Sequence, residues 1–341
     1  MQGVLRSVLV ASLAAGVFAP AAAGAEAAST CKMARIAELP VRVLHNKLIV
    51  DGAINGKYVG ILLDTGAGIT MIPRPTAERL GLSKQSARGY RIFGIGGETD
   101  AESAVVDEFK IGQASANGRR FLVAGEHEPG DGVGVILGED FFHDLDLEFD
   151  LAHNAVRLFQ SKDCDGTSLA YWATSGAGET EIEPVNATGP RIIVPVQING
   201  RPVRAQLDSG AGVSVLDRPE AARLGIVSGP VAGSGRGLGP KAVDFSVVPL
   251  ETFVIGDETI RDTTIELADL SRSTSYIPAG SLLSRKVEGS AAMLLGADFL
   301  RAHRVLIAHG QHKMYFTYAG GPVFSGSEPA KPSASVAPEK N

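Results

Sequence analysis

Two short segments of the chain place an aspartate in the same surroundings. The segment 62–68 (LLDTGAG) returns as 206–212 (QLDSGAG), so Asp64 and Asp208 stand 144 residues apart. Two carboxylates about 3 Å apart cannot both be ionised, so such a pair holds one proton between them. The ionised partner can then take a proton from water while the protonated partner donates to a carbonyl oxygen. Paired in this way, the two aspartates could hydrolyse an amide without a metal or a covalent intermediate.

The same shift of 144 residues relates other segments. The sequence ING at 54–56 returns at 198–200, and RP at 74–75 returns at 218–219. Several matches at one offset indicate an internal duplication. A duplicated chain can supply one carboxylate from each half.

Each half contains the elements needed to position its aspartate. An apolar strand is predicted directly before it, at 58–63 and at 203–207, and an Asn-Gly hairpin turn precedes each strand. A short helix follows each aspartate, at 75–80 and 219–224, with proline near its start and glycine after its end.

A second landmark closes each half. VILG at 135–138 and MLLG at 293–296 each precede a final hairpin. Their shift is 158 residues, so the second half carries 14 more residues than the first. We expect this excess in a polar surface loop within 268–292.

Two glycine-rich loops follow the aspartates at similar distances. FGIGG at 93–97 is typical of a mobile hairpin that closes over an extended substrate, and 233–239 is a less regular counterpart. The sequence leaves open whether one or both loops close. A phosphate-binding role is disfavoured because neither loop precedes a helix that begins with Lys-Ser or Lys-Thr.

Other chemistries find little support. The chain has no Gly-x-Ser-x-Gly and no His-Glu-x-x-His motif. His309 and His312 are expected to be solvated in a hairpin turn, with metal binding as the weaker alternative. We predict no cofactor and no metal. A formal charge of −6 disfavours nucleic acid as a partner.

Over residues 40–319 the chain resembles the retropepsin-like aspartic proteases, in a bacterial exported form with two lobes fused in one chain. The resemblance rests on the two Asp-Thr/Ser-Gly-Ala segments, the two apolar-Gly landmarks and the glycine-rich loop. It implies an all-β fold of two β-barrel lobes, with a short helix in each. The residues that it implicates are the catalytic Asp64 and Asp208, the supporting Thr65, Gly66, Ser209 and Gly210, and the substrate-binding flap Gly94, Ile95, Gly96 and Gly97.

Thr65 and Ser209 are expected to hydrogen-bond across the lobe interface, and the two glycines to allow tight turns beside the carboxylates. We expect an aspartic endopeptidase acting on extended polypeptide substrates. The alternative is a peptide-binding module that uses the same cleft without cleavage, or aspartates that are only turn residues. Since one chain carries both halves, we expect a monomer.

The remaining segments indicate export. Residues 1–28 have the charge, apolar run and small-residue end of a signal peptide, which predicts a periplasmic or secreted protein without stable membrane insertion. Retention of this segment as an uncleaved membrane anchor is the alternative. The two cysteines, Cys31 and Cys164, are then expected to form a disulfide, with two free thiols as the alternative. The predicted domains are an N-terminal lobe (29–160), a linker (161–190), a C-terminal lobe (191–319) and a disordered tail (320–341).

Overall fold

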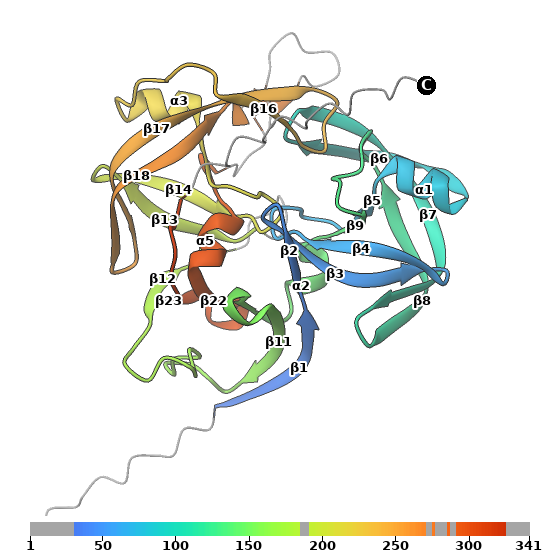
Figure 1. Ribbon diagram of the computed structural model, residues 1–341. Coiled ribbons are helices and arrows are strands. Elements are labelled where there is room, and N and C mark those ends of the chain that lie inside the picture. The colour runs from blue at the N-terminus through green and yellow to red at the C-terminus, as the bar shows by residue number, and fades with distance from the viewer. Residues whose placement is uncertain (1–30, 185–190, 271–274, 277–284, 287–290, 325–341) are drawn as a thin grey trace, which may run out of the picture.

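The computed structural model shows two β lobes side by side above a sheet that both share (Figure 1). It describes residues 31–184, 191–270, 275–276, 285–286 and 291–324. The expected signal peptide lies outside these ranges, as does most of the tail. In the described residues, no helix is long and apolar enough to cross a membrane. The all-β prediction with two lobes is confirmed.

The N-terminal lobe is a closed sheet. Strand β3 (Lys47–Ile54) pairs with β7 (Gly97–Ile111), which closes the sheet into a barrel around a core of apolar side chains. In spatial order the strands are β2 (Arg42–Leu44), β3 (Lys47–Ile54), β4 (Lys57–Leu63), β9 (Val133–Leu137), β5 (Met71–Ile72), β8 (Ala114–Val123), β7 (Gly97–Ile111) and β6 (Lys84–Gly94). The lobe also contains two short helices, α1 (Arg74–Leu80) and α2 (Glu139–Phe142).

The C-terminal lobe repeats this plan. Here β13 (Ile193–Ile198) pairs with β17 (Ala242–Ile255) to close the barrel. The strand order is β13 (Ile193–Ile198), β14 (Arg201–Leu207), β21 (Met293–Leu295), β15 (Val215–Asp217), β18 (Glu258–Ala268), β17 (Ala242–Ile255) and β16 (Gly233–Arg236), with helices α3 (Arg218–Arg223) and α5 (Ala297–Ala302). The four-residue helix α2 and the six-residue α5 were not predicted, because they lack the proline at the start and the glycine at the end that mark α1 and α3.

The Asn-Gly turns form in both lobes as predicted. Asn55 and Asn199 both have φ of 49°, and the glycines that follow both have φ of 74°. Positive φ at both central residues is the geometry of the hairpin turn whose twist matches the flanking strands. The duplication therefore extends to backbone angles.

The final hairpins of the two halves leave their barrels and join in one sheet. Its order is β1 (Lys32–Pro40), β11 (Ala155–Lys162), β10 (Asp146–Asp150), β22 (His303–Ala308), β23 (Lys313–Tyr318) and β12 (Gly178–Glu181). At its centre β10 pairs antiparallel with β22, so that Phe149 faces Val305 across the two halves. The sequence predicts each hairpin within its own lobe, whereas in the structure β10 and β22 pair across the two halves. Leu147 and Phe149 of β10 and Val305 and Ile307 of β22 are fully buried at this junction.

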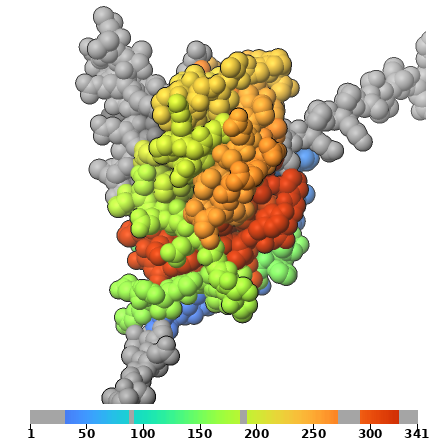
Figure 2. Space-filling model, turned by 90° about the vertical axis from the view of Figure 1, so that its left-hand side faces the viewer, coloured from blue at the N-terminus to red at the C-terminus, as the bar shows by residue number. Residues whose placement is uncertain are grey.

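A short 3-10 helix links the two strands of each final hairpin: η1 (Leu151–His153) and η2 (His309–Gln311). Figure 2 shows the yellow and orange part of the C-terminal lobe lying directly against the red band that includes β22 and β23. The shared sheet is thus a base for both lobes.

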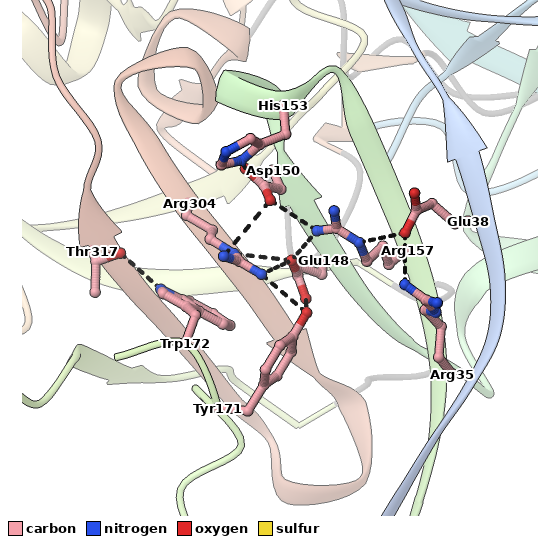
Figure 3. A network of polar contacts seen from close by, with 10 residues as sticks. All are labelled: Arg35, Glu38, Glu148, Asp150, His153, Arg157, Tyr171, Trp172, Arg304 and Thr317. Atoms are coloured by element: carbon pink, nitrogen blue, oxygen red, sulfur yellow. Dashed lines mark hydrogen bonds and ion pairs between the residues drawn. The ribbon is translucent and has the colours of Figure 1, made fainter. Parts of the chain in front are cut away.

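A buried carboxylate fixes the middle of the shared sheet (Figure 3). Glu148 on β10 is fully buried and accepts hydrogen bonds from Arg157 (2.7 Å), Arg304 (2.7 Å) and the Tyr171 hydroxyl (2.7 Å). A buried carboxylate is tolerated only when it is paired and hydrogen-bonded in this way. Because Arg157 and Arg304 come from different halves, this network joins them.

The segment after β11 packs on the same network. The Arg304 guanidinium lies 4.5 Å from the centroid of the Trp172 ring, and the Trp172 indole donates to Thr317 Oγ1 at 2.9 Å. This part of the predicted linker is therefore held on the sheet. The domain boundaries at 160 and 190 stay a prediction.

Cys31 and Cys164 form the predicted disulfide, with Cα atoms 4.2 Å apart. The bridge ties the start of β1 to the end of β11. The tail does not begin at residue 320 as expected, because Phe324 is buried and its ring packs edge-on against Phe253 at 4.9 Å. The polar composition of the tail concealed this one anchoring ring. The loop expected within 268–292 lies largely outside the described residues, apart from the paired strands β19 (Ser275–Tyr276) and β20 (Arg285–Lys286).

Candidate active site

The strands that precede the two aspartates deliver them to the same place. Asp64 follows β4 and Asp208 follows β14, and each of these strands runs parallel to the apolar-Gly landmark strand of its lobe. The backbone N–H of Asp64 donates to Leu137 O and that of Asp208 to Leu295 O, both at 2.9 Å. The landmark therefore fixes the point at which each aspartate leaves its sheet.

The residue after each aspartate reaches into the opposite lobe. Thr65 Oγ1 donates to Leu207 O at 2.8 Å and accepts from Ser209 N–H at 3.0 Å. Ser209 Oγ in turn donates to Leu63 O at 2.8 Å and accepts from Thr65 N–H at 3.0 Å. Both side chains are fully buried. The four bonds lock the two loops to each other, and every polar group in the lock is satisfied.

The positions after Thr65 and Ser209 must be glycine, because there is no space for a side chain. A Cβ atom on Gly66 would lie 2.3 Å from Asp208 Cγ, and one on Gly210 would lie 2.3 Å from Asp64 Cγ. Both glycines lie in turns, as predicted, but neither has a positive φ, so the turn alone does not require glycine. Each glycine instead lets the carboxyl group of the other half approach the backbone. The two aspartates are thereby brought face to face.

The environment of the pair favours one shared proton. Burial, followed by the charge of Asp208, raises the pKa of Asp64 well above its usual value. Burial also raises the pKa of Asp208. Opposing this, Asp64 Oδ1 accepts from Gly66 N–H at 2.9 Å and Asp208 Oδ1 accepts from Gly210 N–H at 3.0 Å. Because these bonds are equivalent in the two halves, the proton belongs to the pair and not to one residue.

Both glycine-rich loops form hairpin tips, and the tips touch. Gly239 N–H donates to Ile95 O at 2.9 Å, and Lys241 N–H donates to Gly96 O at 3.1 Å. Gly96 and Gly97 have φ of 94° and 110°, which favours glycine. Sequence reasoning left open whether one or two loops close; in the structure the two tips are bonded to each other.

Each tip also packs on the opposite lobe. Leu238 packs against a buried cluster of the N-terminal lobe that includes Leu62 and Met71, and Ile95 packs against a buried cluster of the C-terminal lobe that includes Val215. The role of Leu238 was not predicted, since a single leucine among glycines carries no signal.

A second aspartate in each half supports the active loop and was also missed. Asp140 Oδ1 accepts from Thr70 N–H (2.8 Å) and Thr70 Oγ1 (2.7 Å). Asp298 accepts likewise from Ser214 N–H (2.9 Å) and Oγ (2.6 Å). The signal was present, because both aspartates lie two residues after the landmark glycine and both hydroxyls lie six residues after a dyad aspartate.

Two further residues have surroundings that were not predicted. Gln206 crosses the interface and donates to Gly66 O at 3.1 Å, whereas its counterpart Leu62 is apolar. His309 was expected to be solvated, but its side chain is only 16% exposed, because the turn that carries it packs against α2. His312 is exposed. In the ranges that the structure describes, no three His, Cys, Asp or Glu side chains are placed to hold a metal ion.

Comparison with known proteins gives one family. The family model described as "Aspartyl protease" matches residues 50–141 and 194–299, once in each lobe. No curated protein matches the sequence. Among solved structures, the aspartic proteinase from Irpex lacteus is similar with a TM-score of 0.48 and 10% sequence identity, covering 83% of this chain and 97% of that chain.

Proposed function

Because the chain belongs to the aspartyl protease family, we propose that it is an endopeptidase in which Asp64 and Asp208 are the catalytic pair. The observation that carries the proposal is the reciprocal approach of each carboxyl group to the glycine of the other half. This approach is useful only if the two carboxyl groups act together, since burying two acids side by side destabilises the fold.

The proposed reaction uses one water molecule. The ionised carboxylate removes a proton from water as its oxygen attacks the scissile carbonyl carbon, and the protonated carboxyl group donates to the carbonyl oxygen. The tetrahedral intermediate then breaks its C–N bond as the leaving nitrogen takes the proton of the protonated carboxyl group and one hydroxyl of the intermediate gives its proton to the ionised carboxylate, which restores the singly protonated pair. The buried Thr65–Ser209 lock would keep the carboxyl groups in place during both steps.

The substrate is an extended polypeptide, which would lie under the tips of the two hairpins. Gly94, Ile95, Gly96 and Gly97 would serve as one flap and 233–239 as the other. Since Gly239 N–H and Lys241 N–H bond to the opposite tip, these bonds must open before a polypeptide enters.

A single chain supplies both carboxylates, so we propose a monomer. We also propose that the protein is periplasmic or secreted. The Cys31–Cys164 disulfide supports this, because disulfides persist in oxidising compartments.

The test is digestion of a denatured protein mixture by the chain from residue 29, with mass spectrometry of the cut sites at pH 4 to 8. The control is the Asp64→Asn/Asp208→Asn variant, shown by circular dichroism to be folded. Cuts that disappear in the control are expected. A folded wild-type chain that binds peptides but cuts none at any pH would overturn the proposal in favour of a peptide-binding module.

A further inference from the structure

A buried acid and an imidazole meet between the two halves, directly behind the N-terminal active loop. Glu139 on α2 is 1% exposed, and its Oε2 lies 3.4 Å from Nε2 of His309 on η2. Within the described part of the chain, neither carboxylate oxygen of Glu139 has a hydrogen-bond partner, nor does His309 Nε2. At 3.4 Å the two groups attract as an ion pair but are too far apart for a good hydrogen bond.

The contacts of the two ring nitrogens of His309 indicate that the pair holds one proton beyond the one on Nδ1. Nδ1 lies 2.6 Å from Leu145 O, and since a carbonyl oxygen only accepts, Nδ1 carries a hydrogen. A neutral ring would then point the lone pair of Nε2 at the Glu139 carboxylate. Two acceptors facing each other in a buried place repel, so the contact is favourable only with one more proton in the pair.

The surrounding charges favour that proton on His309. Burial lowers the pKa of His309, but the Glu139 carboxylate, the Leu145 carbonyl and the charge of Asp146 outweigh burial and raise it. The pair borders a cavity of about 370 Å³ that reaches Gly68. The other charged or titratable groups around it are Asp140, His143, Asp146, Glu183, Arg191 and His312. Asp140 and Glu183 are already bonded, to Thr70 and Arg204.

The backbone of Glu139 holds the active loop. Its N–H donates to Ala67 O at 2.8 Å, three residues after Asp64. The preceding Gly138 is so close to this loop that a Cβ would lie 2.7 Å from Ala67 O. A shift of α2 is therefore transmitted to the loop that carries Asp64.

The other half of the molecule has no such pair at the equivalent place. The landmark shift of 158 residues relates Glu139 to Ala297 and His309 to Leu151, and both counterparts are buried. The backbone bond is nevertheless the same, since Ala297 N–H donates to Ala211 O at 2.8 Å. An apolar contact is thus sufficient to hold a loop of this kind. The Glu139–His309 pair differs from it in that its strength depends on a proton.

We propose that Glu139 and His309 form a protonated latch between the two halves that positions the Asp64 loop and weakens as the pair loses its proton. The two are positioning residues, and the effect on activity rests on the proposed endopeptidase function. Because folding raises the affinity of His309 for its proton, the latch is complete below the usual pKa of histidine and is lost as pH rises through the raised pKa.

The first test is the melting temperature from pH 5 to 9 of the wild type and of Glu139→Ala/His309→Leu, which copies the Ala297/Leu151 site. The wild type should lose roughly 2–4 °C more than the double variant as pH rises. The matched control is His312→Asn, which copies Asn154 and should follow the wild type. Equal pH slopes in the wild type and the double variant would overturn the latch.

The second test is the single variant His309→Leu, which leaves the Glu139 carboxylate buried without a partner. It should melt below the double variant at neutral pH, because removing both groups restores an apolar contact. Should the single variant fail to fold while the double variant folds, the same conclusion follows. A single variant as stable as the double variant would contradict the latch.

Two readouts on the wild type complete the design. NMR titration of the His309 ring should give a pKa above 6.5, and a value at or below 6.5 would overturn the proposal. If the protein cleaves peptides, the alkaline limb of kcat/KM should move to higher pH in the double variant, and an unchanged limb would count against the latch. If it cleaves nothing, the proposed function fails while the melting and NMR tests still decide on the latch.

Discussion

The two lobes agree where they meet at the dyad and differ in the layer behind it. At the interface each lobe gives one aspartate, one hydroxyl and one glycine, and the bonds match within 0.1 Å. Behind it, an exposed Asp140 corresponds to a buried Asp298, and the Glu139–His309 pair corresponds to alanine and leucine. Groups that must act as a symmetric pair kept their symmetry, whereas groups that only support one loop diverged.

The comparison predicts that the two dyad aspartates are equally indispensable. Asp64→Asn and Asp208→Asn should each lower kcat by roughly 10³-fold or more, since either change leaves one carboxyl group unable to play both roles. The measurement is kcat on a peptide taken from a mapped cut site. A variant that keeps a tenth of the wild-type rate would show that the two halves are not equivalent.

The two halves also differ in covalent structure, because the disulfide belongs to the N-terminal half. It closes 133 residues in the N-terminal half, and removing it in Cys31→Ser/Cys164→Ser should cost about 4–5 kcal/mol of unfolding free energy by the chain-entropy estimate. Urea unfolding with and without reductant measures this. If the reduced wild type is as stable as the oxidised protein, the bridge does not strengthen the shared sheet.

The hydrogen bonds between Thr65 and Ser209 should contribute equally to stability from the two lobes. Thr65→Val leaves Leu207 O and Ser209 N–H without partners, and Ser209→Ala leaves Leu63 O and Thr65 N–H in the same position. Each should lower the unfolding free energy by about 2–4 kcal/mol, because buried polar groups lose their bonds. The double variant should cost less than the sum. Costs that differ severalfold in urea unfolding would break the symmetry argued here.

The smallest expected effect is on the pH dependence of stability, and it distinguishes Asp298 from its counterpart Asp140. Burial, only partly opposed by the bonds from Ser214, raises the pKa of Asp298 to about 6. A raised pKa means that stability is greatest below the unfolded value and falls as pH rises through 6, by at most about 2–3 kcal/mol. Asp298→Asn should flatten the fall of unfolding free energy between about pH 4 and 6, measured in urea. Asp140→Asn is the matched control and should leave the fall intact.

Local patterns were sufficient to predict that Asp64 and Asp208 meet, and to predict the Asn-Gly turns and the helices α1 and α3. In each case a few neighbouring residues determine the geometry, and the duplication provided an internal check. The shared sheet was not predictable, because nothing in the alternation of β10 indicates that its free edge pairs with β22. Glu139 and His309 were missed for the same reason: they are 170 residues apart, and only the folded chain brings them together.

The shared sheet also sets an order for making the protein. Once residue 162 has emerged, from the ribosome or from the channel that exports the chain, β10 and β11 can pair. The other edge of β10 then has no partner until the strand that begins at His303 has emerged as well. Until then, this unpaired edge of β10 is open to other chains, and unpaired strand edges promote aggregation. The nascent chain therefore passes through a vulnerable interval that ends only when nearly all of it has emerged, and a chaperone that shields this edge would raise the yield.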